Sequence, residues 1–233
     1  GDTSQGFTAM ANVSDRIKSL TSTGFTLGTT GVNSSGNNYR YIAWRIPPSG
    51  SLGVGLVDSG GSTVSAPSFN LASLGFLFEC SSTSGLIGQS SQRIRITNTT
   101  ASPGWTLSIA PSAGTTALWK NAGNTQSYDF NDSTSSGCSD GVDADSKGGR
   151  MTIDPSVGVL SAQSGCTNAN TSLTTGTSFQ EGVVDSITLL SASSSAQTNC
   201  YWDLTGVGVG QTVPAEQASD NYKLDLTVTV TAS

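Results

Sequence analysis

Apolar and polar residues alternate through most of this 233-residue chain, and this period of two constrains the fold more than any other feature. Successive side chains of a β-strand point to opposite faces, so the pattern is typical of a strand with one buried face. The longest case is the segment 222–231, which predicts a half-buried strand. Its apolar positions are Tyr222, Leu224, Leu226, Val228 and Val230.

Shorter segments repeat this alternation between turns rich in Gly, Ser, Asn and Pro, so seven or more strands are expected. The only helical expectation is a single turn at 215–218, after Pro214. The pattern predicts an all-β fold, an antiparallel β-sandwich of the jelly-roll or immunoglobulin-like kind, with a barrel as the alternative. The alternating apolar positions are Phe76/Phe78/Cys80, Ile94/Ile96, Trp105/Leu107/Ile109, Met151/Ile153, Ile187/Leu189 and Cys200/Trp202/Leu204.

Two prolines followed by Ser and Gly interrupt the pattern at 47–53 and predict a domain boundary. We expect an N-terminal strand segment over 1–52 and a sandwich domain over 53–233. The first part holds only three strand candidates, which is too little for an independent core. They are Ile17–Thr21, Phe25–Gly28 and Asn38–Ile46.

The segment 39–46 is apolar on both faces, as a strand buried on both sides would be. It could dock on its own sandwich, on a neighbouring subunit or on part of a longer precursor. Unpaired strand edges readily join the sheet of another chain, and a head-to-tail contact that does not close produces a filament. We therefore predict an assembly strand with contact residues Tyr39, Tyr41, Ile42, Trp44 and Ile46.

Charged residues make up only 11% of the chain, against roughly 25% in an ordinary globular domain. With a net charge of −6 and a pI near 4.4, nucleic-acid binding is not expected. The chain contains no histidine, which rules out Ser-His-Asp and Cys-His catalysis. We predict that the protein is not an enzyme.

The chain has four cysteines and is rich in serine and threonine. An even number of cysteines in a chain of this kind favours two disulfides and a secreted protein. Three pairings are possible. We favour Cys166–Cys200, because both residues lie in or beside Ser- and Asn-rich loops that flank one predicted hairpin, and this leaves Cys80–Cys138. Zinc is disfavoured because the chain lacks both Cys-x-x-Cys spacing and histidine. The sequence has no apolar run of about 18 residues, so no membrane-spanning helix is expected.

Acidic residues are concentrated between Tyr128 and Asp154, where six of the 16 in the chain lie within 27 positions. Crowded carboxylates favour calcium, which takes oxygen ligands. An EF-hand starting at Asp143 would place Lys147 at a ligand position, so the site is expected to be irregular. The alternative is a solvated loop whose Asp and Asn side chains bond turn backbone. The candidate ligands are Asp129, Asn131, Asp132, Asp140, Asp143 and Asp145.

Tryptophans in alternating strands are usually packed in the core. We expect this for Trp105 and Trp202, and less strongly for Trp119, which lies in a loop-like segment. The alternative role for all three is a platform on which sugars stack.

Two resemblances cover different parts of the chain. The run from Asp15 to Trp44 resembles the closing strands of a jelly-roll domain of phage and bacterial extracellular proteins. From about residue 56 to 233, the chain resembles bacterial secreted β-sandwich proteins related to the WxL cell-surface domains. That resemblance is carried by Trp105-Thr106-Leu107 and by the run 213–217 before the terminal strand. WxL domains usually have a second Trp-x-Leu in the terminal strand, whereas here Trp202-Asp203-Leu204 lies one strand earlier.

These features together predict a secreted bacterial structural protein. Its identical subunits would form an extracellular, pilus-like filament or surface assembly by strand complementation, stabilised by disulfides and calcium. The WxL resemblance implies the alternative, an adhesin-like module that binds the cell wall or a polysaccharide. The jelly-roll resemblance implies a third possibility, a phage fibre or decoration protein.

Overall fold

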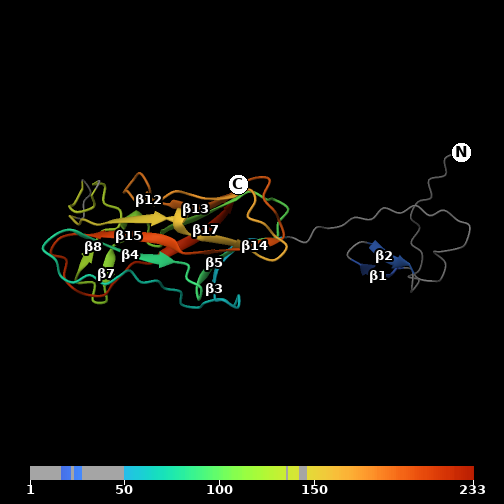
Figure 1. The fold of residues 1–233 in the computed structure, drawn as a ribbon, viewed down its shortest axis with the longest axis horizontal. Coiled ribbons are helices and arrows are strands. Elements are labelled where there is room, and N and C mark those ends of the chain that lie inside the picture. Colours follow the sequence, from blue (N-terminus) through green and yellow to red (C-terminus); the bar gives the residue numbers. More distant parts are fainter. Residues whose placement is uncertain (1–16, 22–23, 28–49, 135, 142–145) are drawn as a thin grey trace, which may run out of the picture. The chain divides into compact units, whose positions relative to one another are not determined.

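The computed structural model describes residues 17–21, 24–27, 50–134, 136–141 and 146–233 (Figure 1). The chain divides into two units, Gly1–Pro48 and Ser49–Ser233. The second unit begins a few residues before the expected boundary at 52/53. Ser51 already belongs to it, because its N–H donates to Thr99 Oγ1 at 2.8 Å and its carbonyl accepts from the Thr99 N–H at 2.9 Å.

In the first unit, β1 (Ile17–Thr21) and β2 (Gly24–Leu27) pair antiparallel. These strands confirm two of the three N-terminal candidates. The third candidate, Asn38–Ile46, lies outside the described residues. The same holds for the predicted contact residues Tyr39, Tyr41, Ile42, Trp44 and Ile46.

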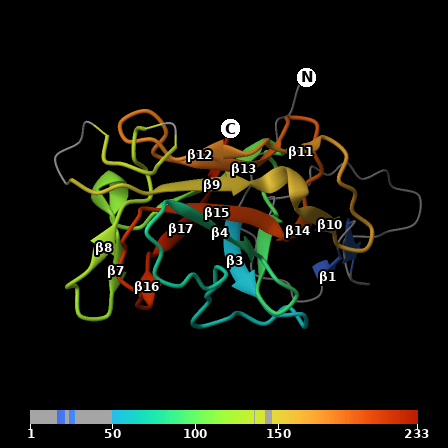
Figure 2. The ribbon, with the colours of Figure 1, turned by 60° about the vertical axis from the view of Figure 1, so that its left-hand side comes forward.

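The second unit is an antiparallel β-sandwich, as the alternation predicted. In one layer, the sheets β10-β14-β5-β3 and β12-β9-β15-β4 follow one another, because β14 continues into β15 through Gly206 (Figure 2). Gly206 has φ +71°, a conformation that favours glycine. The strands of this layer are β3 (Leu52–Val57), β4 (Ser81–Ile87), β5 (Arg93–Asn98), β9 (Arg150–Asp154), β10 (Val159–Ala162), β12 (Thr177–Ser178), β14 (Cys200–Thr205) and β15 (Val207–Val213), with the short 3₁₀ helix η2 (Pro155–Val157) between β9 and β10.

The other layer is built in the same way from the sheets β11-β13-β6-β17 and β16-β7-β8. The chain passes from β6 to β7 through η1 (Gly114–Thr116), and from β16 to β17 through Leu224-Asp225. The strands of this layer are β6 (Trp105–Pro111), β7 (Trp119–Asn121), β8 (Ser127–Tyr128), β11 (Thr171–Leu173), β13 (Ile187–Ala192), β16 (Tyr222–Lys223) and β17 (Leu226–Ala232).

The core lies between the two layers. Trp105 of β6 and Trp202 of β14 are fully buried, and their ring centroids lie 5.5 Å apart. This confirms the expected core role of both residues. Trp119 is also a core residue, because β7 buries its ring and Gln211 of β15 accepts its indole N–H at 2.9 Å. The strand period thus decides which residues face inward along both layers. Other fully buried residues are Ile94, Ile96, Leu107, Ile109, Met151, Ile153, Phe179, Leu189, Leu190 and Leu204.

Three local predictions were wrong. The segment 72–80 is irregular, although Phe76, Phe78 and Cys80 alternate with other residues. A strand also needs a neighbouring strand to bond with, and a short alternating sequence does not supply one. Residues 215–218 contain no helix, and only 215 and 216 form a turn. The predicted strand 222–231 is divided at Leu224-Asp225, since β16 pairs with β7 whereas β17 pairs with β6.

Candidate functional site

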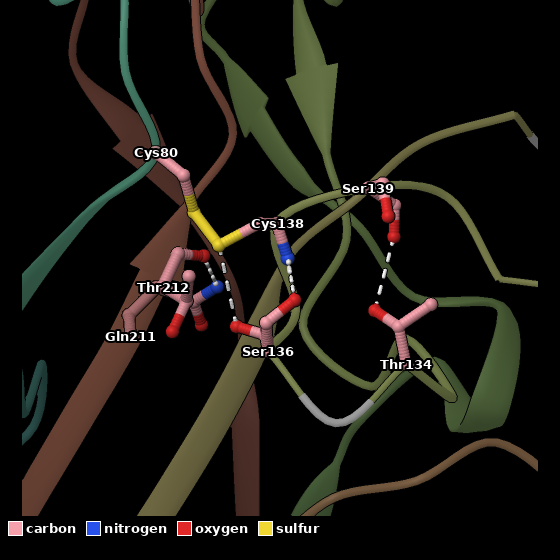
Figure 3. The surroundings of a disulfide bond; sticks show 7 residues. All are labelled: Cys80, Thr134, Ser136, Cys138, Ser139, Gln211 and Thr212. Carbon is pink, nitrogen blue, oxygen red and sulfur yellow. Dashed lines mark hydrogen bonds between the residues drawn. A yellow bond between two sulfur atoms is a disulfide. The ribbon is translucent and has the colours of Figure 1, made fainter.

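Two disulfides have the pairing that the sequence favoured. Cys166 in the loop after β10 is bonded to Cys200 at the start of β14. Cys80, just before β4, is bonded to Cys138 in the acidic loop after β8 (Figure 3). The described part of the chain contains no free cysteine. Such cross-links are typical of proteins that fold in oxidising compartments.

Three of the six predicted calcium ligands lie next to one another in the sandwich. Asp129, Asn131 and Asp132 are buried directly after β8. Asp129 Oδ1 accepts the Phe130 N–H at 2.6 Å, and Asn131 Nδ2 donates to the Thr115 carbonyl at 3.1 Å. The Asp129 bond is a local turn bond of the kind that the alternative interpretation expected. Asn131 instead bonds a carbonyl 16 positions away, and all three side chains are buried, so this part of the stretch is not a solvated loop.

Gly149 lets this loop pack closely. Its φ is +140°, and an added Cβ would collide with the Asp129 carbonyl. Gln211 Nε2 donates to the same carbonyl at 3.1 Å, so the start of the acidic loop is held against β15. A side chain at 149 would push the loop away from the sandwich.

Asp132 is the least satisfied of these acidic side chains. It is 0% exposed, and its Oδ1 accepts the Thr134 N–H at 2.7 Å, while its buried Oδ2 has no hydrogen-bond partner among the described residues. A Cβ on Gly141 would lie 3.0 Å from Asp132 Oδ1 and would collide with Ser133 Oγ, so the chain passes close over the carboxylate. A buried carboxylate oxygen without a partner is costly.

The remaining predicted ligands are placed differently. Asp140 is exposed, and Asp143 and Asp145 lie outside the described residues. Within the described ranges, no three acidic, cysteine or histidine side chains form a group that could hold a metal ion. The described part of the acidic stretch therefore supplies one buried carboxylate with an unsatisfied oxygen.

The sequence analysis missed an ion pair on the outer face of the first layer. Asp203 of β14 lies opposite Arg95 of β5 and accepts from Arg95 Nε at 2.7 Å and from Nη2 at 2.8 Å. Arg93 Nη1 adds a longer contact of 3.4 Å. Burial alone would raise the pKa of Asp203, but the bonds and charges of the two arginines lower it below its usual value. The sequence shows two arginines on one face of a strand, which indicates a nearby acidic group. It does not show which one, because Asp203 lies 108 positions after Arg95.

Arg95 also stacks over the Tyr201 ring, with its guanidinium carbon 4.0 Å from the ring centre. Its hydrogen bond to Asp203 raises the pKa of Arg95, which is partly opposed by burial. A shallow depression of about 240 Å³ lies beside this group and is lined by Gly53, Gly55 and Thr97. Within these described residues, the arrangement links β5 to β14 and offers no acid and base pair for catalysis.

The strand β17 is an edge of its sheet, and its hydrogen-bonding register shows which backbone groups are free. Asp225 accepts from the Ser112 N–H, and the Ser233 N–H donates to the Gly104 carbonyl, so odd-numbered residues here bond toward β6. In an antiparallel ladder the residues between them point the other way. The N–H and C=O groups of Leu226, Val228 and Val230 therefore face an open edge.

The strand β3 is the edge of the facing sheet and lies beside β17. Ser51 bonds toward β5, so Leu52, Val54 and Leu56 direct their backbone groups outward. Part of this edge is covered, since the Val64 N–H donates to the Leu56 carbonyl and Val57 pairs with Thr63.

The two edges border a strip of incompletely covered core, which we call the seam. Its side chains pack against the core but each is only partly buried, whereas the adjacent inward residues of β6 are fully buried. The sandwich is therefore less well covered here than along its middle strands. The seam consists of Leu52, Val54 and Leu56 of β3 and Leu226, Val228 and Val230 of β17.

A second apolar feature is the loop Phe76–Phe78. Phe76 is 48% exposed and Phe78 is 81% exposed, and their rings meet edge to face at 5.1 Å. The Glu216 N–H donates to the Leu77 carbonyl at 2.8 Å, and the Cys80 disulfide follows two residues after Phe78. The loop therefore holds both rings at the surface.

No helix in the described part of the chain is long and apolar enough to cross a membrane. No protein-family model, curated protein or solved structure matches the chain. The resemblances to WxL domains and to a jelly-roll domain therefore stay predictions.

Proposed function

We propose that this chain is a bacterial extracellular structural protein without enzymatic activity, whose identical subunits assemble into a filament or surface layer by exchanging β-strands. The observation that carries the proposal is the division of the chain. The segment 39–46, whose sequence is apolar on both faces, belongs to the first of the two units, and the sandwich is the second. Two apolar faces need cover, and a strand of this kind obtains it by adding to a sheet.

The build of the sandwich supports a location outside the cell. Its two disulfides suit an oxidising environment, and its low content of charged residues leaves a surface dominated by hydroxyl groups. Covalent cross-links also suit a subunit that must stay folded without chaperones or turnover. These features favour a durable structural role over catalysis.

Calcium is part of the proposal. Within the described part of the loop, the buried Oδ2 of Asp132 has no hydrogen-bond partner, and a divalent cation would compensate its charge. Neutral oxygens close to this carboxylate include Ser133 Oγ, beside which the chain passes at Gly141. Calcium at this position would stiffen the loop that the Cys80–Cys138 disulfide already anchors.

Electron microscopy of negatively stained full-length protein, with light scattering after size exclusion, tests the assembly. We expect filaments or large oligomers from the full chain and monomers after deletion of residues 1–50. Deletion of residues 1–16 is the matched control and should leave assembly intact. Full-length chains that stay folded and monomeric with and without calcium would contradict the proposal.

A second candidate function is a module that binds cell wall or polysaccharide, and the loop Phe76–Phe78 favours it. Rigidly held, exposed aromatic rings can stack on sugar faces. Peptidoglycan sedimentation and a glycan array test this function with Phe78→Ser as the variant. Retention of the full chain but not of the variant would support it, and equal retention of both would exclude a role for the loop.

A further inference from the structure

We infer that the open edge of β17 is the acceptor site for assembly, and that the segment 39–46 of a second copy of the chain pairs with it as an added strand. This inference rests on the proposed function and names the site at which it acts. It would place the added strand over the seam.

Backbone geometry favours β17 over β3. Along β17 the outward N–H and C=O groups of Leu226, Val228 and Val230 have no partner in the described part of the chain. On β3, the Leu56 carbonyl already accepts from Val64 and only the first half of the edge is open. An added strand needs an uninterrupted row of donors and acceptors, and β17 supplies it over seven residues.

The side chains of the donor segment match both surroundings of this edge. Inward, the seam offers partly buried Val228 and Val230, which an apolar row would cover. Outward, β17 presents the exposed hydroxyls of Thr227, Thr229 and Thr231. In the fitting orientation, Ile42, Trp44 and Ile46 face the seam, with Arg40 at the end of the same row. The alternate row, which holds the two tyrosines, Ala43 and Arg45, then lies beside the hydroxyls.

The donor is assigned to a second copy because few residues link the segment to β3 of its own sandwich. The sequence Ile46-Pro47-Pro48 also favours an extended link, since a residue before proline avoids the helical region and proline fixes φ. Only 49–51 then remain for a reversal before β3 begins at Leu52. Donation between copies is head-to-tail, so it does not close and growth can continue.

Proline substitution in the full-length chain tests the acceptor edge. In Val228→Pro, the lost N–H is one that faces the open edge, so the ladder to β6 keeps its bonds. Val54→Pro makes the same change on the open edge of β3 and is the matched control. We expect Val228→Pro to reduce the polymer fraction at least tenfold, and Val54→Pro to change it less than twofold, with thermal melting confirming that both variants fold.

Two measurements keep the inference testable if a variant folds poorly. Hydrogen exchange of wild-type protein should show amides of 226–232 at least tenfold more protected in polymer than in monomer. Mixing Trp44→Asp chains, which keep the acceptor edge, with Val228→Pro chains, which keep the donor segment, should yield dimers that stop growing.

Each contrary result has a distinct meaning. Two results would overturn the β17 assignment and leave the proposed function standing. One is a polymer whose 226–232 amides remain unprotected, and the other is assembly that Val54→Pro blocks and Val228→Pro does not. Monomers whose 226–232 amides are already protected would show that the chain's own segment occupies the edge. A wild-type chain that never assembles would defeat the proposed function itself.

Discussion

Replacing each disulfide by a pair of alanines measures how much of the sandwich the covalent links hold. The Cys166–Cys200 bond joins positions 34 apart and the Cys80–Cys138 bond joins positions 58 apart. In the chain-entropy account, closing such loops stabilises the folded state by about 3.8 and about 4.2 kcal/mol respectively. Loop length alone therefore ranks the Cys80–Cys138 bond slightly higher.

Burial reverses this order. Cys200 belongs to the core, whereas Cys80 and Cys138 are only partly buried. Alanine at 200 removes a buried sulfur atom, which costs roughly another 1 kcal/mol. We expect losses in the free energy of unfolding of about 5 kcal/mol for Cys166→Ala with Cys200→Ala and about 4 kcal/mol for Cys80→Ala with Cys138→Ala.

Urea unfolding followed by tryptophan fluorescence is a suitable assay, because Trp105 and Trp202 are buried in the core. Reducing the wild-type protein should lower its stability at least as much as either double variant. The variant without any cysteine is the control and should not respond to reductant. A loss below about 1 kcal/mol for either pair would refute the chain-entropy reasoning, since it predicts several times that value.

Three further predictions concern titratable groups. Asp203→Asn leaves Arg95 without its charged partner and should cost about 2 kcal/mol at neutral pH. The folded pKa of Asp203 lies below its unfolded value of about 3.9. Its contribution to folding stability is therefore present above that pH and is lost as the pH falls through the folded pKa. Melting curves at acidic pH should show a smaller loss of stability for the variant than for the wild-type protein. Burial raises the pKa of Tyr128, so stability should fall as the pH rises above about 10, and Tyr128→Phe should reduce that fall in alkaline melting curves. Millimolar calcium should raise the melting temperature and give binding heat in calorimetry with wild-type protein but not with Asp132→Asn; wild-type protein without heat or shift would exclude calcium.

Some properties of this protein follow from the sequence alone, because they depend on near neighbours in the chain. Alternation over a few residues marks most of the strands and their inward faces, so Trp105 and Trp202 could be placed in the core. The chemistry of four cysteines in a chain without histidine favoured disulfides over zinc. These are local or compositional constraints, and they hold whichever strands become neighbours.

The tertiary structure alone decided which features meet. Six acidic residues are close in sequence, yet Asp132 is buried and Asp140 is exposed, because packing against neighbouring segments separates them. Arg95 and Asp203 meet only because β5 and β14 pair, and the seam exists only because β3 and β17 both end their sheets. Strand order is set by contacts between residues far apart in the chain, and a period of two carries no information about partners. The sequence therefore predicted an assembly strand but not the edge that could accept it.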